Sequence, residues 1–161
     1  MDQGNQLFPV FFKMHELDVL VVGGGYVGLE KLEAILKNSP DTRVTLVGRE
    51  ILQPDIFRLA GKHPNIQVVE RPFRWRDLRG KDLVFLATND RSLHERIKKR
   101  TRQRRIMTNV ADTPDLCDFY LSSVVKKGDL KIAISSNGKS PTLTKRIRQY
   151  LEEVIPDHVQ G

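Results

Sequence analysis

The stretch from Leu17 to Gly28, LDVLVVGGGYVG, decides the fold. Its first six residues are nearly all aliphatic, as expected of a strand that is buried on both faces of a parallel sheet. The glycine pattern Gly23-x-Gly25-x-x-Gly28 follows at once, and in Tyr26–Lys37 the apolar residues recur roughly at helical spacing. A strand, a glycine turn and a helix in this order predict the first half of a dinucleotide-binding unit.

Each glycine of this loop has a physical role in such a unit. Gly23 permits the tight turn, Gly25 lets the backbone approach a pyrophosphate, and Gly28 lets the helix pack close to the sheet. The start of the helix then offers N–H groups and a partial positive charge to the phosphates. The residues expected to bind the dinucleotide here are Gly23, Gly24, Gly25, Tyr26, Val27 and Gly28. The alternative is a glycine turn without a ligand, which the flanking strands and helices disfavour.

The alternation of strands and helices continues through the first two thirds of the chain. Further strands are expected at residues 43–47, 66–69, 83–87 and 105–110, and helices at 51–61 and 91–102. Strands that alternate with helices pair in parallel through right-handed crossovers, with helices on both faces. We therefore predict an α/β, Rossmann-type, doubly wound sheet over residues 1–114.

A smaller segment, residues 115–161, follows with a different rhythm. We expect two strands at Phe119–Val125 and Leu130–Ser135 and a helix at Pro141–Val154. Lys126–Asp129 is a glycine-containing hairpin turn, and Ser140 precedes Pro141 as the helix N-cap. A hairpin and one helix have little core of their own, so we expect this segment to pack on the sheet domain or on another subunit. We favour a homodimer.

The composition limits the classes of protein that need considering. The chain has 161 residues, a net charge of +7 and one cysteine, Cys117, which excludes an internal disulfide and suits a reducing compartment. The basic balance favours an anionic partner. No apolar run is long enough to span a bilayer, and Met1–Gln6 lacks the features of a signal peptide, so we expect a cytoplasmic protein. No metal-binding spacing is present, and the four histidines, His15, His63, His94 and His158, are expected at the surface or in turns.

The nucleotide preference stays open in the sequence. An acidic residue usually ends the second strand and binds the ribose hydroxyls. Here Val47 is followed by Gly48, Arg49 and Glu50. Glu50 could bind the ribose one or two positions late, and Arg49 could instead favour the 2′-phosphate of NADP. A third reading makes both of them solvated loop charges.

The basic run Arg96–Arg105 is the strongest charge feature. The simplest interpretation is the solvated face of a helix. A functional one is attraction of a polyanionic substrate, which raises its association rate. Nucleic-acid binding is disfavoured, because no aromatic residue interleaves the run and no nucleic-acid-binding motif accompanies it.

Several motifs in order along the chain resemble the precorrin-2 dehydrogenase/sirohydrochlorin ferrochelatase family of sirohaem biosynthesis. They are LFPVF at 7–11, VVGGG at 21–25, LEK at 29–31, LATND at 86–90, NVAD at 109–112, DFY at 118–120, GDL at 128–130 and ISSNGKSP at 134–141. The resemblance runs from Leu7 to Glu153.

The resemblance implies an activity and a set of site residues. The family oxidises precorrin-2 to sirohydrochlorin with NAD, and some members also insert ferrous iron into the product. The matching motifs imply cofactor contacts at Thr88, Asn89 and Asn109. They also imply an intertwined homodimer, with the tetrapyrrole in the dimer cleft beside the nicotinamide. A non-catalytic nucleotide-sensing module is the alternative from another functional class.

Asp112 is the candidate for the proton transfer that accompanies hydride loss. It matches the aspartate of the family motif and follows the fifth predicted strand, at the edge where such sheets bind ligands. A carboxylate there could act as a general base, and the same group could serve iron insertion. The alternative is an aspartate that caps the turn before Thr113 and Pro114.

The polar loop before the last helix is the candidate substrate site. Its members are Ser135, Ser136, Asn137, Gly138 and Lys139. Backbone N–H groups at a helix start suit carboxylates, and precorrin-2 carries many of them. The alternative is a plain helix-capping turn.

Overall fold

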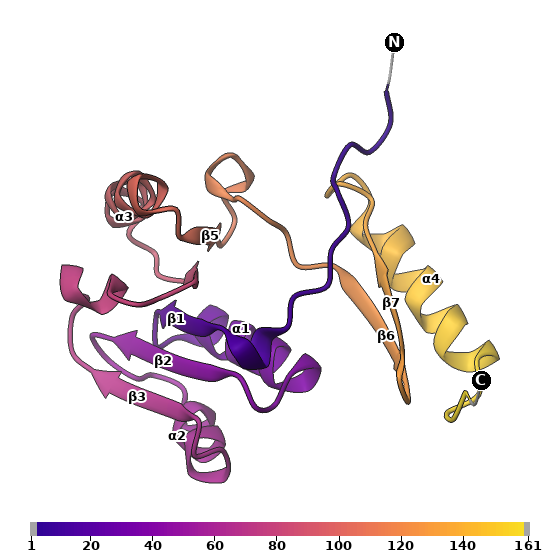
Figure 1. Ribbon diagram of the computed structural model, residues 1–161, viewed down its shortest axis with the longest axis horizontal. Helices are drawn as coiled ribbons and strands as arrows, with labels where there is room; N and C mark the ends of the chain where they lie inside the picture. Colours follow the sequence, from indigo (N-terminus) through magenta and orange to yellow (C-terminus); the bar gives the residue numbers. More distant parts are fainter. Residues whose placement is uncertain (1–2, 160–161) are drawn as a thin grey trace. The chain divides into compact units, whose positions relative to one another are not determined.

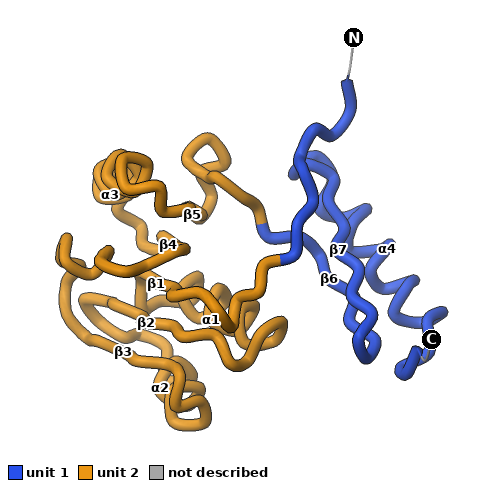
Figure 2. The backbone as a smooth tube through the Cα atoms, viewed as in Figure 1, with its two compact units in different colours: residues 1–11, 121–161 blue, residues 12–120 orange. Residues whose placement is uncertain are grey.

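The computed structural model describes residues 3–159 and divides into two compact units (Figure 2). The sheet unit comprises residues 12–120, and the hairpin unit comprises residues 1–11 together with 121–161. The division predicted from the sequence, after residue 114, is six residues earlier and assigned the first residues to the sheet unit. The hairpin unit is therefore built from two segments that are distant in the sequence.

The sheet unit contains one parallel sheet of five strands in the order β3-β2-β1-β4-β5 (Figure 1). The strands are β1 (Asp18–Val22), β2 (Arg43–Gly48), β3 (Ile66–Glu70), β4 (Leu83–Leu86) and β5 (Met107–Val110). The helices are α1 (Tyr26–Asn38), α2 (Pro54–Lys62) and α3 (Arg91–Arg104). The predicted α/β class and the parallel doubly wound sheet are confirmed.

Two hydrophobic clusters lie on the two faces of this sheet. Leu32 and Ile35 of α1 and Ile56 of α2 belong to one cluster. Ile97 of α3 belongs to the other, together with Leu78 of the short 3-10 turn η2 (Trp75–Leu78). The strand residues between them alternate, as a sheet covered on both sides requires.

The starts of α2 and β5 differ from the sequence prediction for local reasons. Helix α2 begins at Pro54 rather than Ile51, because proline suits the first helical position. The backbone before it turns toward the glycine loop, where Leu52 N–H donates to the Gly24 carbonyl at 2.8 Å. Helix α3 ends at Arg104, and its C-cap Arg105 has a left-handed φ of 58°, so β5 begins two residues later than predicted.

Phe119 was predicted to begin a strand but packs inside the sheet unit instead. Its ring meets Phe85 edge to face at 5.6 Å and Phe12 at 6.2 Å between ring centroids. The amide of Asn109 donates to its carbonyl oxygen at 2.9 Å. Strand β6 therefore begins only at Ser123.

The hairpin unit consists of β6 (Ser123–Lys127), the antiparallel β7 (Leu130–Ile134) and α4 (Pro141–Val154). Gly128 has φ of 61° in the turn between the strands. Ser140 Oγ accepts from Leu143 N–H at 3.4 Å, which confirms the predicted N-cap and the predicted bounds of the helix. Asn5 donates to Ser135 Oγ at 3.2 Å and so joins the two segments of this unit.

Candidate dinucleotide site

The carboxyl ends of four strands meet at one edge of the sheet unit. Val22 of β1 is level with Val47 of β2 and with Leu86 of β4, and Leu86 is level with Val110 of β5. The segments that leave the sheet at this edge contain the predicted site residues Gly23–Gly28, Arg49, Glu50, Thr88, Asn89 and Asp112. Ligands of open α/β sheets bind at such an edge.

Gly23 and Gly28 are required by the local backbone. Gly23 has φ of 135°, and a Cβ atom there would lie 2.5 Å from the Ala87 carbonyl oxygen. A Cβ atom on Gly28 would lie 2.1 Å from the carbonyl oxygen of Gly23. Gly23 therefore makes the tight turn predicted for it, whereas Gly28 packs the start of α1 against the loop at Gly23 rather than against the sheet.

Gly24 lies against the end of the second strand. A Cβ atom on Gly24 would lie 2.3 Å from the Glu50 carbonyl oxygen, and one on Gly48 would lie 2.9 Å from the Gly24 nitrogen. Both glycines thus allow two loops to touch, which brings the segment after β2 beside the start of α1. This is where a Rossmann fold holds the adenosine ribose.

Gly25 faces open space, which is the condition for a ligand to approach. A Cβ atom there would meet nothing within 4 Å, although Gly25 is the N-cap of α1. No side chain caps this helix end within the described residues. The N–H groups of its first turn, from Tyr26 onward, have no acceptor inside the helix, so the loop fits a pyrophosphate group.

Arg49 and Glu50 are both exposed, and no contact distinguishes their two predicted roles. A carboxylate from the neighbouring strand fixes the backbone beside them, because Glu70 Oε2 accepts from Ile51 N–H at 2.7 Å. Glu70 was not singled out in the sequence. It lies on β3 opposite Gly48, so only the strand pairing brings it to this loop.

Thr88 is held by a buried histidine. His94, on α3, is 3% exposed, so the prediction of a surface or turn position for it was wrong. Its Nε2 atom lies 2.7 Å from Thr88 Oγ1 and accepts from Thr88 N–H at 3.3 Å. Burial lowers the pKa of His94, and the nearby charge of Asp90 opposes this only in part.

Asp112 lies two residues after the end of β5 with φ of 57°, a left-handed conformation that is uncommon for residues other than glycine. Its side chain is exposed and makes no hydrogen bond or ion pair within residues 3–159. The turn that follows is instead held by the hydroxyl of Thr113, which donates to the Ala111 carbonyl at 3.2 Å. The carboxylate of Asp112 is therefore available for a ligand.

Asn109 lies one residue before the end of β5 and is buried. Its amide donates to the Phe119 carbonyl oxygen, so the structure gives it a role in fixing the chain after β5. Asp118 assists: its Oδ2 accepts from Thr108 N–H at 2.8 Å, and its Oδ1 lies 2.6 Å from Lys98 Nζ. The predicted cofactor contact of Asn109 stays a prediction.

The polar loop of the hairpin unit uses several of its own N–H groups. Asn137 N–H donates to Ser135 Oγ, and Ser140 N–H donates to Ser136 Oγ, each at 3.1 Å. Lys139 N–H donates to the Ser136 carbonyl, also at 3.1 Å. These bonds match the capping alternative, so the predicted binding of substrate carboxylates now depends chiefly on the exposed side chain of Lys139.

The basic helix α3 has an aromatic neighbour that the linear sequence did not reveal. The Arg100 guanidinium lies 5.5 Å from the ring centroid of Trp75, which in turn meets Phe73 edge to face. Trp75 is 25 residues away in sequence and reaches α3 through the turn η2. The contact between the Trp75 ring and the Arg100 guanidinium therefore indicates packing of η2 against α3.

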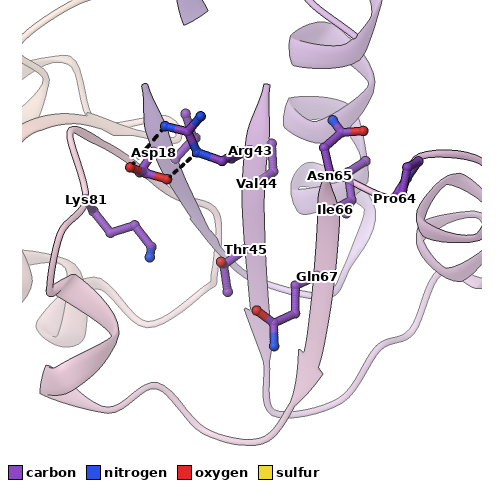
Figure 3. Close-up of a pocket in the computed structure, with 10 residues that line it drawn as sticks. Asp18, Arg43, Val44, Thr45, Pro64, Asn65, Ile66, Gln67 and Lys81 are labelled. Carbon is purple, nitrogen blue, oxygen red and sulfur yellow. Dashed lines mark hydrogen bonds and ion pairs between the residues drawn. The ribbon is translucent and has the colours of Figure 1, made fainter. Parts of the chain in front are cut away.

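A cavity of about 330 Å³ lies at the opposite edge of the sheet unit, among the amino ends of β1, β2 and β3 (Figure 3). Arg43 and Lys81 contribute positive charge there, but Arg43 Nε is paired with Asp18 Oδ1 at 2.8 Å. The crossover from β3 to β4 contains only the short turn η2 in place of a full helix. The cavity has no part in the dinucleotide site.

Comparison with known proteins agrees with this geometry. Residues 10–123 match a family model described as putative NAD(P)-binding, and residues 127–153 match one described as sirohaem biosynthesis protein central. The chain belongs to the NAD(P)-binding family that the first model describes, and its C-terminal segment also matches the sirohaem model. The resemblance stated from the sequence motifs is confirmed.

Curated relatives in this family are longer proteins. A siroheme synthase of Pseudoalteromonas atlantica is 38% identical over 96% of this chain, and one of Nitrosomonas europaea is 33% identical over 92% of it. The chain spans about a third of their length, 32% and 30% respectively. A solved structure named SirC, precorrin-2 dehydrogenase, is 24% identical, with a TM-score of 0.74 over 94% of this chain and 72% of that one. It has the same fold.

Membrane-spanning helices and clusters of metal ligands are both absent from the described residues. Among residues 3–159, no helix is long and apolar enough to cross a membrane. In the same range, no three histidine, cysteine, aspartate or glutamate side chains gather as they would around a metal ion. The cytoplasmic location stays a prediction.

Proposed function

We propose that this chain is a precorrin-2 dehydrogenase, which oxidises precorrin-2 to sirohydrochlorin with NAD. The observation that carries the proposal is the meeting of the glycine loop, Thr88 and Asp112 at one edge of one sheet. A dinucleotide-sensing module needs the glycine loop but has no use for an unpaired carboxylate beside it. The names of the relatives and of the solved structure support the same choice.

The glycine loop and the start of α1 are the proposed pyrophosphate site. Gly25 leaves room for the phosphates, and the N–H groups of Tyr26 and Val27 point out of the first helical turn. NAD, when bound, supplies a hydride acceptor. Glu50 would bind the ribose hydroxyls of NAD and Arg49 the 2′-phosphate of NADP, and both side chains are exposed after β2.

Asp112 is the proposed proton acceptor. Oxidation of precorrin-2 removes a hydride and a proton, and the proton needs a base within reach of the same carbon skeleton. Asp112 follows β5 at the same edge of the sheet where Thr88 follows β4, and its carboxylate has no partner among the described residues. The left-handed backbone at Asp112 is consistent with a functional position, since such conformations gather at active sites.

The substrate is a polyanion, and the charge of the protein suits it. The net charge of +7 favours association with a tetrapyrrole that carries many carboxylates. Lys139, exposed before α4, is the proposed carboxylate partner in the hairpin unit. The basic residues of α3 would act at longer range, through the association rate rather than through contact.

We further propose that the protein is a homodimer built through the hairpin unit. Four large apolar residues on α4, at spacings of four, three and four, form an exposed stripe: Leu143, Ile147, Tyr150 and Val154, each between 37% and 63% exposed. A two-stranded sheet with one helix is marginal by itself. A second copy of the chain would cover this stripe and supply the missing core.

The decisive experiment is an anaerobic assay of the purified chain with precorrin-2 and either NAD or NADP, followed by addition of ferrous iron. We expect formation of reduced dinucleotide and sirohydrochlorin, with the ratio of the two rates giving the nucleotide preference. Iron insertion faster than the spontaneous reaction would add the chelatase activity. Tight dinucleotide binding without any oxidation would instead favour the sensing module.

A further inference from the structure

The backbone N–H group of Thr88 determines which nitrogen of the His94 ring carries the proton. The N–H group of Thr88 lies 3.3 Å from His94 Nε2 and can only donate to it. The Nε2 atom therefore carries the lone pair, and the proton of the neutral ring is on Nδ1. The ring is buried, so its neutral form is the stable one.

The state of His94 determines what the Thr88 hydroxyl can do. Oγ1 lies 2.7 Å from the same Nε2 atom, so the hydroxyl donates its one proton to the ring. Asp90 N–H donates to Oγ1 at 3.1 Å and occupies one of its lone pairs. A hydroxyl has one proton and two lone pairs, so a single acceptor position remains for a ligand.

We propose that His94 is a positioning residue that presents Thr88 to the bound dinucleotide as a hydrogen-bond acceptor. The group that meets Thr88 is then a donor of the nucleotide, a ribose hydroxyl or the carboxamide NH2, and not a phosphate oxygen. This inference depends on the proposed function only in that a nicotinamide dinucleotide binds at this edge of the sheet. It assigns the phosphates to the glycine loop and a donor group to Thr88.

Protonation of His94 would reverse this arrangement. A proton on Nε2 would face the N–H group of Thr88. The Thr88 hydroxyl would then accept from the ring and present its own proton to the ligand in place of a lone pair. Around the ring, Asp90 at the start of α3 is the charge that opposes the effect of burial, and strands β4 and β5 carry no titratable side chain. Dinucleotide affinity should therefore fall in acid, below the ordinary titration range of histidine.

The test compares three variants by titration of the full chain with NADH. His94→Leu fills the space without an acceptor, and His94→Gln returns an amide oxygen near the position of Nε2. Thr101→Val is the matched control, because Thr101 is a buried residue two turns further along α3 whose hydroxyl accepts from Thr108 Oγ1 at 2.8 Å. Thermal unfolding of each variant measures the structural damage separately.

We expect His94→Leu to weaken NADH binding about tenfold, as loss of one good hydrogen bond does. His94→Gln should stay within about threefold of the wild-type affinity, and Thr101→Val should bind NADH normally although it is less stable. As the pH falls below 6.5, the ordinary pKa of histidine, the wild type should lose affinity and His94→Gln should lose less.

Three results would overturn the inference, and they are distinguishable. Equal NADH affinity of the wild type and His94→Leu would remove His94 from the site and leave the proposed function standing. Equal weakening in the Leu and Gln variants would assign His94 to packing alone. A wild-type protein that binds no dinucleotide at all would refute the proposed function itself, and this inference with it.

Discussion

Gly28 approaches Gly23 so closely that a Cβ atom on Gly28 would lie 2.1 Å from the Gly23 carbonyl oxygen. The first turn of α1 is thus pressed against the loop that precedes it. Gly25, between them, has nothing within 4 Å of its own Cβ position. The two glycines of one motif therefore have separate tasks, one for packing and one for the ligand.

This difference predicts that the same substitution, glycine to alanine, lowers stability at one position and NADH affinity at the other. Gly28→Ala should lower the free energy of unfolding by about 1–3 kcal/mol, because the backbone must move to admit the methyl group. Gly25→Ala should leave the stability within about 0.5 kcal/mol and weaken NADH binding about tenfold or more, because the methyl group occupies the space of the phosphates. Urea unfolding and NADH titration measure the two quantities. Normal NADH binding by Gly25→Ala would place the pyrophosphate elsewhere.

Asp112→Asn should separate the charge of Asp112 from its backbone. Asparagine tolerates the left-handed conformation as well as aspartate does, so the fold and NADH affinity should be unchanged. The turnover of precorrin-2 should fall roughly 100-fold or more, as expected on removal of a general base. Asp115→Asn, an exposed carboxylate three residues further on, is the control. Unchanged turnover in Asp112→Asn would assign the proton to another group.

The Arg71–Asp77 pair should give the sheet unit a stability that depends on pH. Burial of Asp77 opposes its ionisation, but two hydrogen bonds from Arg71, at 2.7 and 2.9 Å, and one from Arg74 N–H outweigh it and hold the pKa of Asp77 below 3.8. A lowered pKa in the folded state stabilises the protein above pH 3.8, and this contribution disappears as the pH falls through the folded value.

Asp77→Asn should therefore lose about 1.5–3 kcal/mol of unfolding free energy at pH 7. Its difference from the wild type should shrink toward zero as the pH falls below the pKa of Asp77. Urea unfolding at a series of pH values measures this. Asp55→Asn, whose exposed pair with Arg58 should contribute little, is the control. A difference that stays constant down to strong acid would show that the charge of Asp77 is not the cause.

Charge on the α4 stripe should break the proposed dimer. Leu143→Glu combined with Tyr150→Glu would place two carboxylates in the interface, and sedimentation should then give a monomer where the wild type gives a dimer. Gln149→Glu adds one carboxylate on another face of α4 and should leave the dimer intact. A monomeric wild type at micromolar concentration would contradict the proposal directly.

The sequence was most informative where local signals agree. Helix α4 has its predicted bounds because Ser140 and Pro141 mark its start and no competing contact displaces them. The strands before the glycine loop and at residues 83–86 were clear because both of their faces are buried. The strand start predicted at Phe119 was wrong, because an aromatic followed by apolar residues resembles a strand. Only the fold brings Phe119 against Phe85 and Phe12.

The supporting contacts of the site were less accessible to prediction. Glu70 and Trp75 act through strand pairing and a crossover, which a single sequence does not specify. His94 has a signal in the sequence, because it shares a helix face with Ile97 and Thr101, three and seven residues later, and all three are buried. A histidine on an apolar face needs a hydrogen-bonding partner, and the nearest loop contains Thr88.

The bond between Asn5 and Ser135 has a consequence for how the chain is made. The two residues are 130 positions apart, so at ordinary rates of translation Asn5 waits on the order of ten seconds for its partner. The sheet unit lies wholly between them and should fold first. Hydrogen exchange during refolding should accordingly protect β1 and β4 before β6. Phe8 and Phe11 are largely exposed even in the finished unit. During that interval they are exposed apolar side chains on a nascent chain whose hairpin unit has not yet been synthesised.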